Sequence, residues 1–399
     1  MKYTWDYNEL RNRRDALINL YNNSNISDKK EIGIVISTYD ILLHSISENR
    51  NVNRNRKGLD NSILYDSTIR DENLDELIMD FSYFYEKKYI PILNFILPTW
   101  DIIKDFDFKC KGFRIASTNE ELIKVTLDFF KVMTTPHIYN QVKEVFKNDK
   151  NFLNIIYSKA YNPNPGITIV DSILKKEYIS IARANTIFDY TVLPHQLFHY
   201  IYADYDLKTL VNHNAFLLSE VEGMFADILF SEFYNKYFDH TKTQDSELLK
   251  KFSLSVFKEE LTGLVVRNGI LECIGENNKI RLHKLNKYNS FFKIPTVDKL
   301  NDLIPYLDTP QEELMTYSLS YLVALDLYQI YKRDREYAFY LIKCIRFLKE
   351  EDNIKSLLIR NEITFFQDNY KNLKEYIQAI LSRVLIHFIG NCGNNGIKQ

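Results

Sequence analysis

Glycine and proline are scarce in this chain, and their scarcity limits what it can fold into. The 399 residues include 11 glycines and 9 prolines, against 28 tyrosines and 26 phenylalanines. Glycine and proline are the residues that most readily interrupt a helix. Apolar residues recur at helical spacing in five long segments, 6–23, 31–46, 73–96, 119–147 and 297–389. We therefore predict a mostly α-helical protein, long enough to bury one large core or two modest ones.

The pattern changes at a turn cluster, Tyr-Asn-Pro-Asn-Pro-Gly, at residues 161–166. Two short β-rich runs follow, at 166–170 and 177–182, and a hairpin is predicted over 270–283. The sequence therefore predicts a small sheet near residues 166–182, just before the next helical stretch. The Gly/Asn-rich tail, 390–399, is predicted to be flexible.

Charge and hydropathy exclude several classes of protein. Lys and Arg number 51 and Asp and Glu 53, giving a net charge of -2, so we expect no nucleic-acid partner. No stretch approaches 18 apolar residues and the first residues lack an apolar signal core, so we expect no membrane association. A polar, Arg-rich run at 49–61 is either an exposed loop, which we prefer, or an anion-binding arm.

The cysteines point to a reducing compartment. Four are scattered along the chain without a Cys-x-x-Cys pair, which argues against a disulfide scaffold at this length. They are Cys110, Cys273, Cys344 and Cys392. We therefore expect reduced thiols and a cytoplasmic protein.

Two histidines with helical spacing are the main chemical signal. His195 and His199 are four residues apart, so on a helix both imidazoles lie on one face and can reach one ion. Pro194 is tolerated in the first turns of a helix, so this helix is predicted to begin near residues 189–191. Zinc accepts two such histidines together with a third protein ligand.

The third ligand is expected from the next helical stretch, residues 219–225. It offers Glu220 and Glu222, which are two apart and point to different helix faces, so both cannot bind the same metal. Spacing alone leaves both glutamates open. It also leaves open a chance pair of histidines with no metal.

Residues 187–230 resemble the active-site region of the thimet oligopeptidase and oligoendopeptidase F family of zinc metallopeptidases. That family carries His-Glu-x-x-His on one helix and a glutamate ligand on the next, in a pattern like Ala-Glu-Val-Ala-Ser-Thr-Phe. Residues 219–225, Ser-Glu-Val-Glu-Gly-Met-Phe, are similar to this pattern with Glu220 in the ligand position. The resemblance implies one Zn²⁺ per chain, bound by His195, His199 and Glu220.

A second match lies far downstream. Residues 317–325 and 346–349 are similar to the family's Tyr-rich helix and the segment after it. The resemblance implies that Tyr321, and less directly Tyr317, stabilises the oxyanion of the transition state. The resemblance covers roughly residues 165–360. It implies an N-terminal helical lobe at 1–160 and a zincin-like catalytic lobe at 161–389.

The chain departs from the family at the residue after the first histidine. Gln196 stands where the family has the glutamate that takes a proton from the attacking water, and an amide cannot take up that proton at neutral pH. Either the glutamate was replaced deliberately, which the intact ligand set favours, or the protein is a natural relative that does not hydrolyse. A second departure lies at 308–313, which lacks the family's substrate-gripping His and Tyr.

We therefore predict a mostly α fold with two helical lobes around a zinc cleft and a small sheet beside the active-site helices. The predicted function is a zinc metallopeptidase acting on peptides, in an inactive form because of Gln196; the alternative is a pseudopeptidase that binds zinc and peptides. Asp227 is either a partner for a ligand histidine or a solvated surface carboxylate. Tyr178, Ile179 and Ser180 are candidates for binding substrate along a sheet edge, and a plain buried strand would show the same pattern. The composition is compatible with a homodimer.

Overall fold

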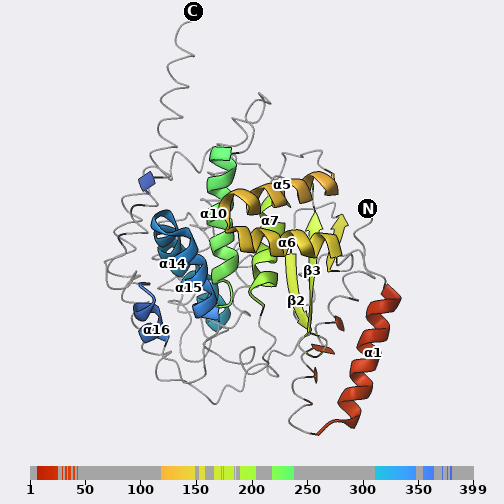
Figure 1. The fold of residues 1–399 in the computed structure, drawn as a ribbon. Coiled ribbons are helices and arrows are strands. Elements are labelled where there is room, and N and C mark those ends of the chain that lie inside the picture. The colour runs from red at the N-terminus through yellow and green to blue at the C-terminus, as the bar shows by residue number, and fades with distance from the viewer. Residues whose placement is uncertain are drawn as a thin grey trace, which may run out of the picture.

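The computed structural model describes residues 7–25, 118–148, 152–157, most of 166–203, 218–237, 311–346 and 354–363, with single positions in 29–43 and 371–379. Helices dominate these residues, as predicted, and a small mixed sheet lies among them (Figure 1). The described helices are α1 (Tyr7–Asn23), α5 (Asn119–Met133), α6 (Pro136–Asn148), α7 (Asp189–Ile201), α10 (Val221–Tyr237), α14 (Gln311–Arg333), α15 (Arg335–Arg346) and α16 (Ile354–Arg360).

The sheet has three described strands, β1 (Leu153–Tyr157), β2 (Gly166–Asp171) and β3 (Lys176–Arg183), in the order β1-β3-β2. β1 runs parallel to β3, and β2 runs antiparallel to it. The runs predicted at 166–170 and 177–182 are β2 and β3. We did not predict β1, because a short apolar run next to a helix does not reveal its own period.

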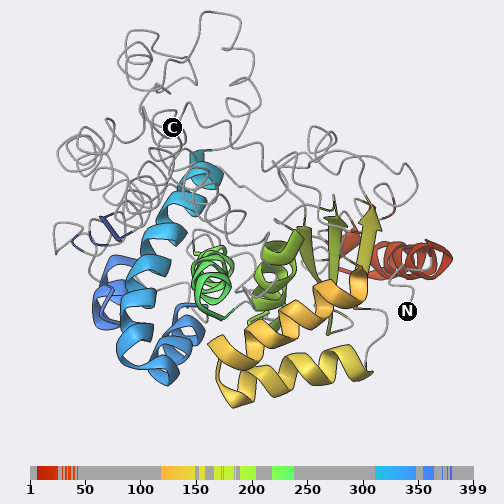
Figure 2. The ribbon, with the colours of Figure 1, turned by 90° about the horizontal axis from the view of Figure 1, so that it is seen from above.

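The elements are stacked in layers (Figure 2). Seen from above, α14 and α15 lie at one end of a row, followed by α10, α7, the sheet and then α1, while α5 and α6 lie along one side of this row. α7 contacts both α10 and the sheet. The helix that carries the two histidines is therefore enclosed by described elements on two sides.

A cluster of phenylalanines forms the centre of the main core. Phe198 of α7 is fully buried, and its ring lies 5.3 Å from that of Phe130, 6.4 Å from that of Phe225 and 6.1 Å from that of Phe339. Leu193 and Leu197 of α7 are also buried in this core. His195 and His199 are offset by two positions from these leucines and therefore project from another side of the helix.

The predicted lobe boundary at residue 160 falls between two strands that pair with each other. β1 precedes it and bonds to β3, which follows it. α5 also precedes the boundary, and its Phe129 and Phe130 belong to the same core as α7 and α10. The division into lobes stays a prediction, and this part of residues 1–160 packs with the histidine helix.

A second, smaller core joins α1 to the sheet. The rings of Tyr178 of β3 and Tyr39 pack edge to face with their centroids 6.3 Å apart. The Arg13 guanidinium of α1 lies 5.4 Å from the centroid of the Tyr178 ring. The Tyr39 hydroxyl donates to the buried Asp171 carboxylate at 2.8 Å. These contacts fix the N-terminal helix to the sheet.

Some expectations fall outside the described residues. They are the run at 49–61, the helical segment at 73–96, the hairpin at 270–283, residues 308–310, the tail at 390–399 and three of the four cysteines. The fourth, Cys344, is a free thiol. Among the described helices, none is both long and apolar enough to cross a membrane.

Substitution of Phe198 tests the packing of the core that supports α7. Phe198→Ala removes a fully buried ring, so we expect it to lower the free energy of unfolding by about 3–5 kcal/mol. Denaturant unfolding in the presence of a chelator measures this without any contribution from metal. Tyr340→Ala is the matched control, because Tyr340 is 60% exposed. An unfolding midpoint for Phe198→Ala equal to that of the control would contradict the packing described.

Candidate metal centre

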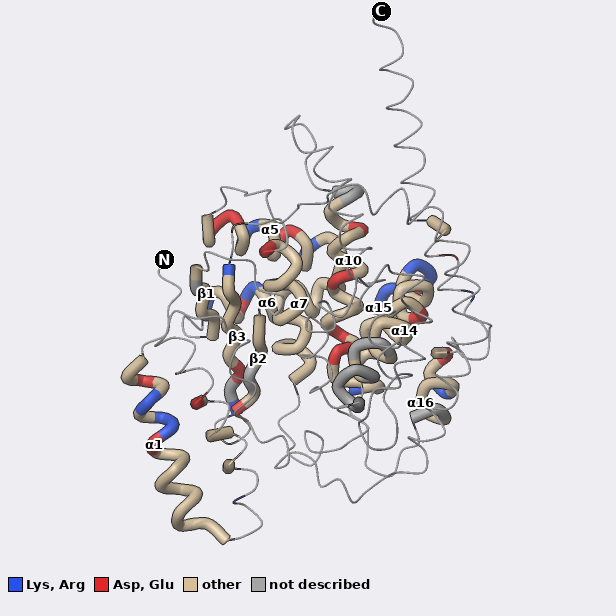
Figure 3. Tube along the Cα trace, turned by 180° about the vertical axis from the view of Figure 1, so that it is seen from behind, with Lys and Arg blue, Asp and Glu red and all other residues tan. Residues whose placement is uncertain are grey.

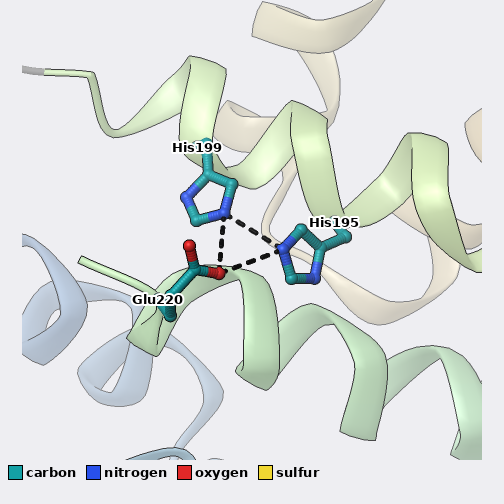
Figure 4. A group of neighbouring side chains, drawn as sticks. All are labelled: His195, His199 and Glu220. Carbon is teal, nitrogen blue, oxygen red and sulfur yellow. Dashed lines mark hydrogen bonds and ion pairs between the residues drawn. The ribbon is translucent and has the colours of Figure 1, made fainter. Parts of the chain in front are cut away.

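α7 brings the two histidines together. The helix begins at Asp189, within the predicted range. The Nε2 atoms of His195 and His199 lie 3.1 Å apart, and the two rings meet edge to face with centroids 4.8 Å apart (Figure 4). Both side chains are largely shielded from solvent.

Glu220 completes the group from the start of α10. Its main-chain oxygen accepts the first helical hydrogen bond, from the amide of Met224, which fixes the residue at the helix N-terminus. Its Oε2 lies 3.4 Å from His195 Nε2 and 3.5 Å from His199 Nε2 (Figure 4). His195, His199 and Glu220 are the group of potential metal ligands found among the described residues.

The spacing of these three atoms fits zinc. Four ligands at about 2.0–2.1 Å around a tetrahedral ion are separated from one another by about 3.3–3.4 Å. The three separations here, 3.1, 3.4 and 3.5 Å, lie close to that value. The group therefore has the shape of three corners of a tetrahedron.

Two further carboxylates set the tautomers of the histidines. His195 Nδ1 lies 2.8 Å from Asp227 Oδ2, and His199 Nδ1 lies 3.2 Å from Glu222 Oε1. Figure 3 shows the acidic positions spaced along α10, from which both carboxylates reach α7. A carboxylate at Nδ1 favours a proton there, which leaves the Nε2 lone pair to face the ion.

Glu222, one of the two glutamates that spacing left open, therefore contacts a histidine rather than joining the ligand group. Asp227 occupies the place expected of it, beside His195. The part that Glu222 plays was missed, because sequence spacing gives helix faces but not the direction in which a neighbouring helix lies.

The electrostatics of the group favour a positive charge. Burial lowers the pKa of His195, but the carboxylates of Asp227 and Glu220 outweigh burial and raise it well above the usual 6.5. His199 behaves similarly: burial lowers its pKa, and Glu220 and Glu222 raise it to a net value above 6.5. Burial raises the pKa of Glu220, yet hydrogen bonds from both histidines hold it far below its ordinary value. The same carboxylates that favour a bound proton also favour a metal cation.

A glycine permits the close approach of the two helices. A Cβ at position 223 would lie 2.5 Å from His195 Cε1 and Nε2 and 2.8 Å from His199 Nε2, closer than real side-chain carbons come. Position 223 must therefore lack a side chain if the imidazoles are to keep their places.

Gln196 lies against the edge of the sheet. Its side chain is 8% exposed, and its Cγ and Nε2 approach Gly166 so closely that a Cβ there would clash. Thr168 Oγ1 is 2.9 Å from the main-chain oxygen of Gln196 and 2.8 Å from its side-chain Oε1. A hydroxyl has one proton and can satisfy only one of these oxygens. With the amide turned so that its NH₂ donates to Thr168, both contacts become hydrogen bonds.

The strand predicted to lie at a sheet edge is the central one of the described sheet. Tyr178, Ile179 and Ser180 were expected at a sheet edge, but β3 is the central strand, paired with β1 and β2 on either side. Tyr178 faces the small core beside α1, and Ile179 faces the main core. The alternating pattern predicted a strand, but the pairing order depends on residues elsewhere in the chain. Among the described strands, β2 is the edge strand that lies against α7 and Gln196.

The structure describes only one of the two tyrosine side chains that are predicted to stabilise the oxyanion. Tyr321 lies on α14 and is buried in the main core. The side chain of Tyr317 lies outside the described residues. The oxyanion role of both stays a prediction.

Comparison with solved structures identifies the fold. The chain matches PZ peptidase A, solved with an inhibitor, with a TM-score of 0.60 over 88% of this chain and 64% of that one, at 13% identity. It matches a protein described as an oligoendopeptidase F with a TM-score of 0.56 over 75% of this chain and 58% of that one, at 13% identity. An oligoendopeptidase F from Bacillus anthracis gives 0.53 over 89% and 64%, at 14% identity.

The chain therefore shares the fold of these proteins and spans about three fifths of their length. No protein-family model matches the sequence, and no curated protein matches it in sequence. At this level of identity the comparison shows the fold. Any likeness in chemistry depends on the residues of the metal centre.

Gly223→Ala tests the approach of α7 and α10. The added methyl group overlaps both imidazoles, so we expect zinc affinity to fall at least about tenfold while the protein stays folded. Isothermal titration of the metal-free protein with zinc measures this. Gly33→Ala is the matched control, because a Cβ at Gly33 meets its nearest neighbour at an ordinary 3.7 Å. Equal affinity in both variants would contradict the geometry of the centre.

Zinc affinity should also depend on pH. Zinc must displace protons from His195 and His199, whose pKa values are raised above 6.5, so protons compete at a higher pH than for free histidine. We expect the affinity to fall as pH decreases, starting above pH 6.5. Titrations between about pH 8.5 and 6 in a non-coordinating buffer measure this. A constant affinity down to pH 6.5 would contradict the raised pKa values.

Proposed function

We propose that this chain is a zinc-dependent peptidase of the oligoendopeptidase type, held in an inactive form by glutamine at position 196. The observation that carries the proposal is the convergence of His195 Nε2, His199 Nε2 and Glu220 Oε2 at separations of 3.1–3.5 Å. The shared fold with proteins named as peptidases supports the same reading.

The residues of the chain have separable roles in this proposal. His195, His199 and Glu220 hold the metal, and Asp227 and Glu222 orient the two imidazoles through Nδ1. A bound zinc ion supplies Lewis-acid activation of water and of the peptide carbonyl. Residue 196, next to the first ligand, is the general base when it is glutamate. Tyr321 is the proposed donor to the developing oxyanion.

The edge strand β2 is the proposed site for the peptide backbone. It lies against α7, and its outer side carries no partner strand among the described residues. An extended peptide that adds to such an edge is bound by main-chain hydrogen bonds, with little demand on its sequence. Gly166 and Thr168, both of β2, contact Gln196, so a peptide on this edge would lie next to the reacting position.

One observation favours a second candidate function, a zinc- and peptide-binding protein that does not hydrolyse. With its NH₂ group turned toward Thr168, the amide of Gln196 donates to the Thr168 hydroxyl while that hydroxyl donates to the main-chain oxygen of Gln196, whereas a carboxylate could only accept. In this second candidate, glutamine is the natural residue at position 196. Zinc then serves binding and structure.

Restoring the carboxylate separates the two candidates. For Gln196→Glu we expect kcat/KM on short peptides to rise by about 10²–10⁴-fold, because a positioned general base returns. Cleavage of a mixed peptide library, followed by mass spectrometry, measures this. Gln196→Glu combined with His195→Ala is the control for contaminating peptidases.

The possible results are distinct. New cleavage that the His195→Ala control lacks supports the peptidase. A Gln196→Glu protein that binds zinc and peptides without cleaving them supports the second candidate. A protein that binds no zinc, or binds it equally after His195→Ala, contradicts both.

A further inference from the structure

A buried carboxylate next to the metal centre contacts two residues that are far apart in the sequence. Glu222 Oε1 lies 3.2 Å from His199 Nδ1 on α7 and 3.5 Å from Arg346 Nε. Arg346 is the last residue of α15. One oxygen atom thus connects a ligand histidine to an arginine of the C-terminal part of the chain.

We propose that Arg346 is a positioning residue of the metal centre, which acts through Glu222 to hold the imidazole of His199 in its metal-binding orientation. The inference rests on the proposed function, since it assigns a role relative to the bound metal. Among the described residues, the contact of Arg346 near the metal centre is with Glu222, which is not one of the three proposed ligands.

The charge of Glu222 requires a partner. Its side chain is 1% exposed, so water does not solvate the carboxylate, and a buried charge is stable only beside a compensating one. A metal-binding histidine is neutral with its proton on Nδ1, so His199 donates a hydrogen bond but brings no charge of its own. The guanidinium of Arg346 is always charged, and among the contacts of the described residues it is the permanent cation beside Glu222.

The other ligand histidine does not need such a partner. Asp227, which contacts His195, is 21% exposed and is partly solvated. The arginine therefore stands at the more deeply buried of the two carboxylates. In the pattern that residues 219–225 resemble, alanine stands at the position of Glu222, so Glu222 is a departure of this chain from that pattern.

The core fixes the place of Arg346. On α15, Phe339 packs 6.1 Å from the Phe198 ring and 5.8 Å from the Phe225 ring, and Ile342 and Ile345 are buried. Phe198 lies between the two ligand histidines in the sequence of α7. The packing that seats α15 against α7 and α10 therefore also seats the arginine against Glu222.

A double-mutant cycle on zinc affinity tests the proposal. Glu222→Gln keeps the shape but loses the charge, and we expect it to weaken zinc binding by about 10–100-fold. Arg346→Met should weaken binding in the same direction by a smaller factor. Adding Arg346→Met to Glu222→Gln should cause no further loss, because the arginine acts through the carboxylate. Competition with a chromophoric chelator measures all four affinities.

Control variants separate a specific effect of Arg346 on the metal centre from a general loss of folding. Lys343→Met, on an exposed position of the same helix, should bind zinc like the parent. Arg346→Lys, which keeps a charge, should recover part of the loss and serves if Arg346→Met does not fold. The visible spectrum of the Co²⁺-loaded protein should change in Arg346→Met and Glu222→Gln and stay constant in Lys343→Met, since it reports the ligand geometry.

Two results would overturn the proposal while leaving the proposed function intact. One is an Arg346→Met protein that binds zinc as tightly as the parent. The other is an equal loss of zinc affinity when Arg346→Met is introduced into the parent and into Glu222→Gln. Such a result would show that the arginine does not act through Glu222. A parent protein that binds no zinc would instead overturn the proposed function, and this inference with it.

Discussion

The close packing of α10 against α7 is the contact on which the metal centre depends. At Gly223 the helices approach so closely that a Cβ would overlap both imidazoles. That approach brings Glu220, Glu222 and Asp227 to the nitrogens of His195 and His199. Phe198, on another side of α7, anchors the same helix in the phenylalanine core. Core packing and ligand geometry are therefore properties of one helix pair.

Much of this could be predicted from local sequence. Few glycines and prolines predict helices, the alternating run at 177–182 predicts β3, and two histidines four apart predict a shared face. These signals act over a few residues. The central place of β3 and the contact between Glu222 and His199 depend on how distant segments pack, so a single sequence does not reveal them. Gly223 and Arg346 belong with them, since each acts on a residue of another helix.

Gln196 does not fit the chemistry that the rest of the site is arranged for. The carboxylates on α10 arrange both histidines for a cation, which is the arrangement a working metallopeptidase needs. The amide beside them cannot act as a base, and with its NH₂ group turned toward Thr168 it turns both Thr168 contacts into hydrogen bonds. Metal binding and turnover are therefore separate properties of this site. In the proposed function, His195, His199 and Glu220 govern the first, and residue 196 governs the second.

The most direct test of the central claim is a crystal structure of the zinc-loaded protein with anomalous data at the zinc edge. We predict one strong peak per chain, about 2.0–2.1 Å from His195 Nε2, His199 Nε2 and an oxygen of Glu220. Asp227 and Glu222 should remain on the Nδ1 atoms. A peak elsewhere, a peak bound by Glu222 in place of Glu220, or no peak between the two histidines would contradict it.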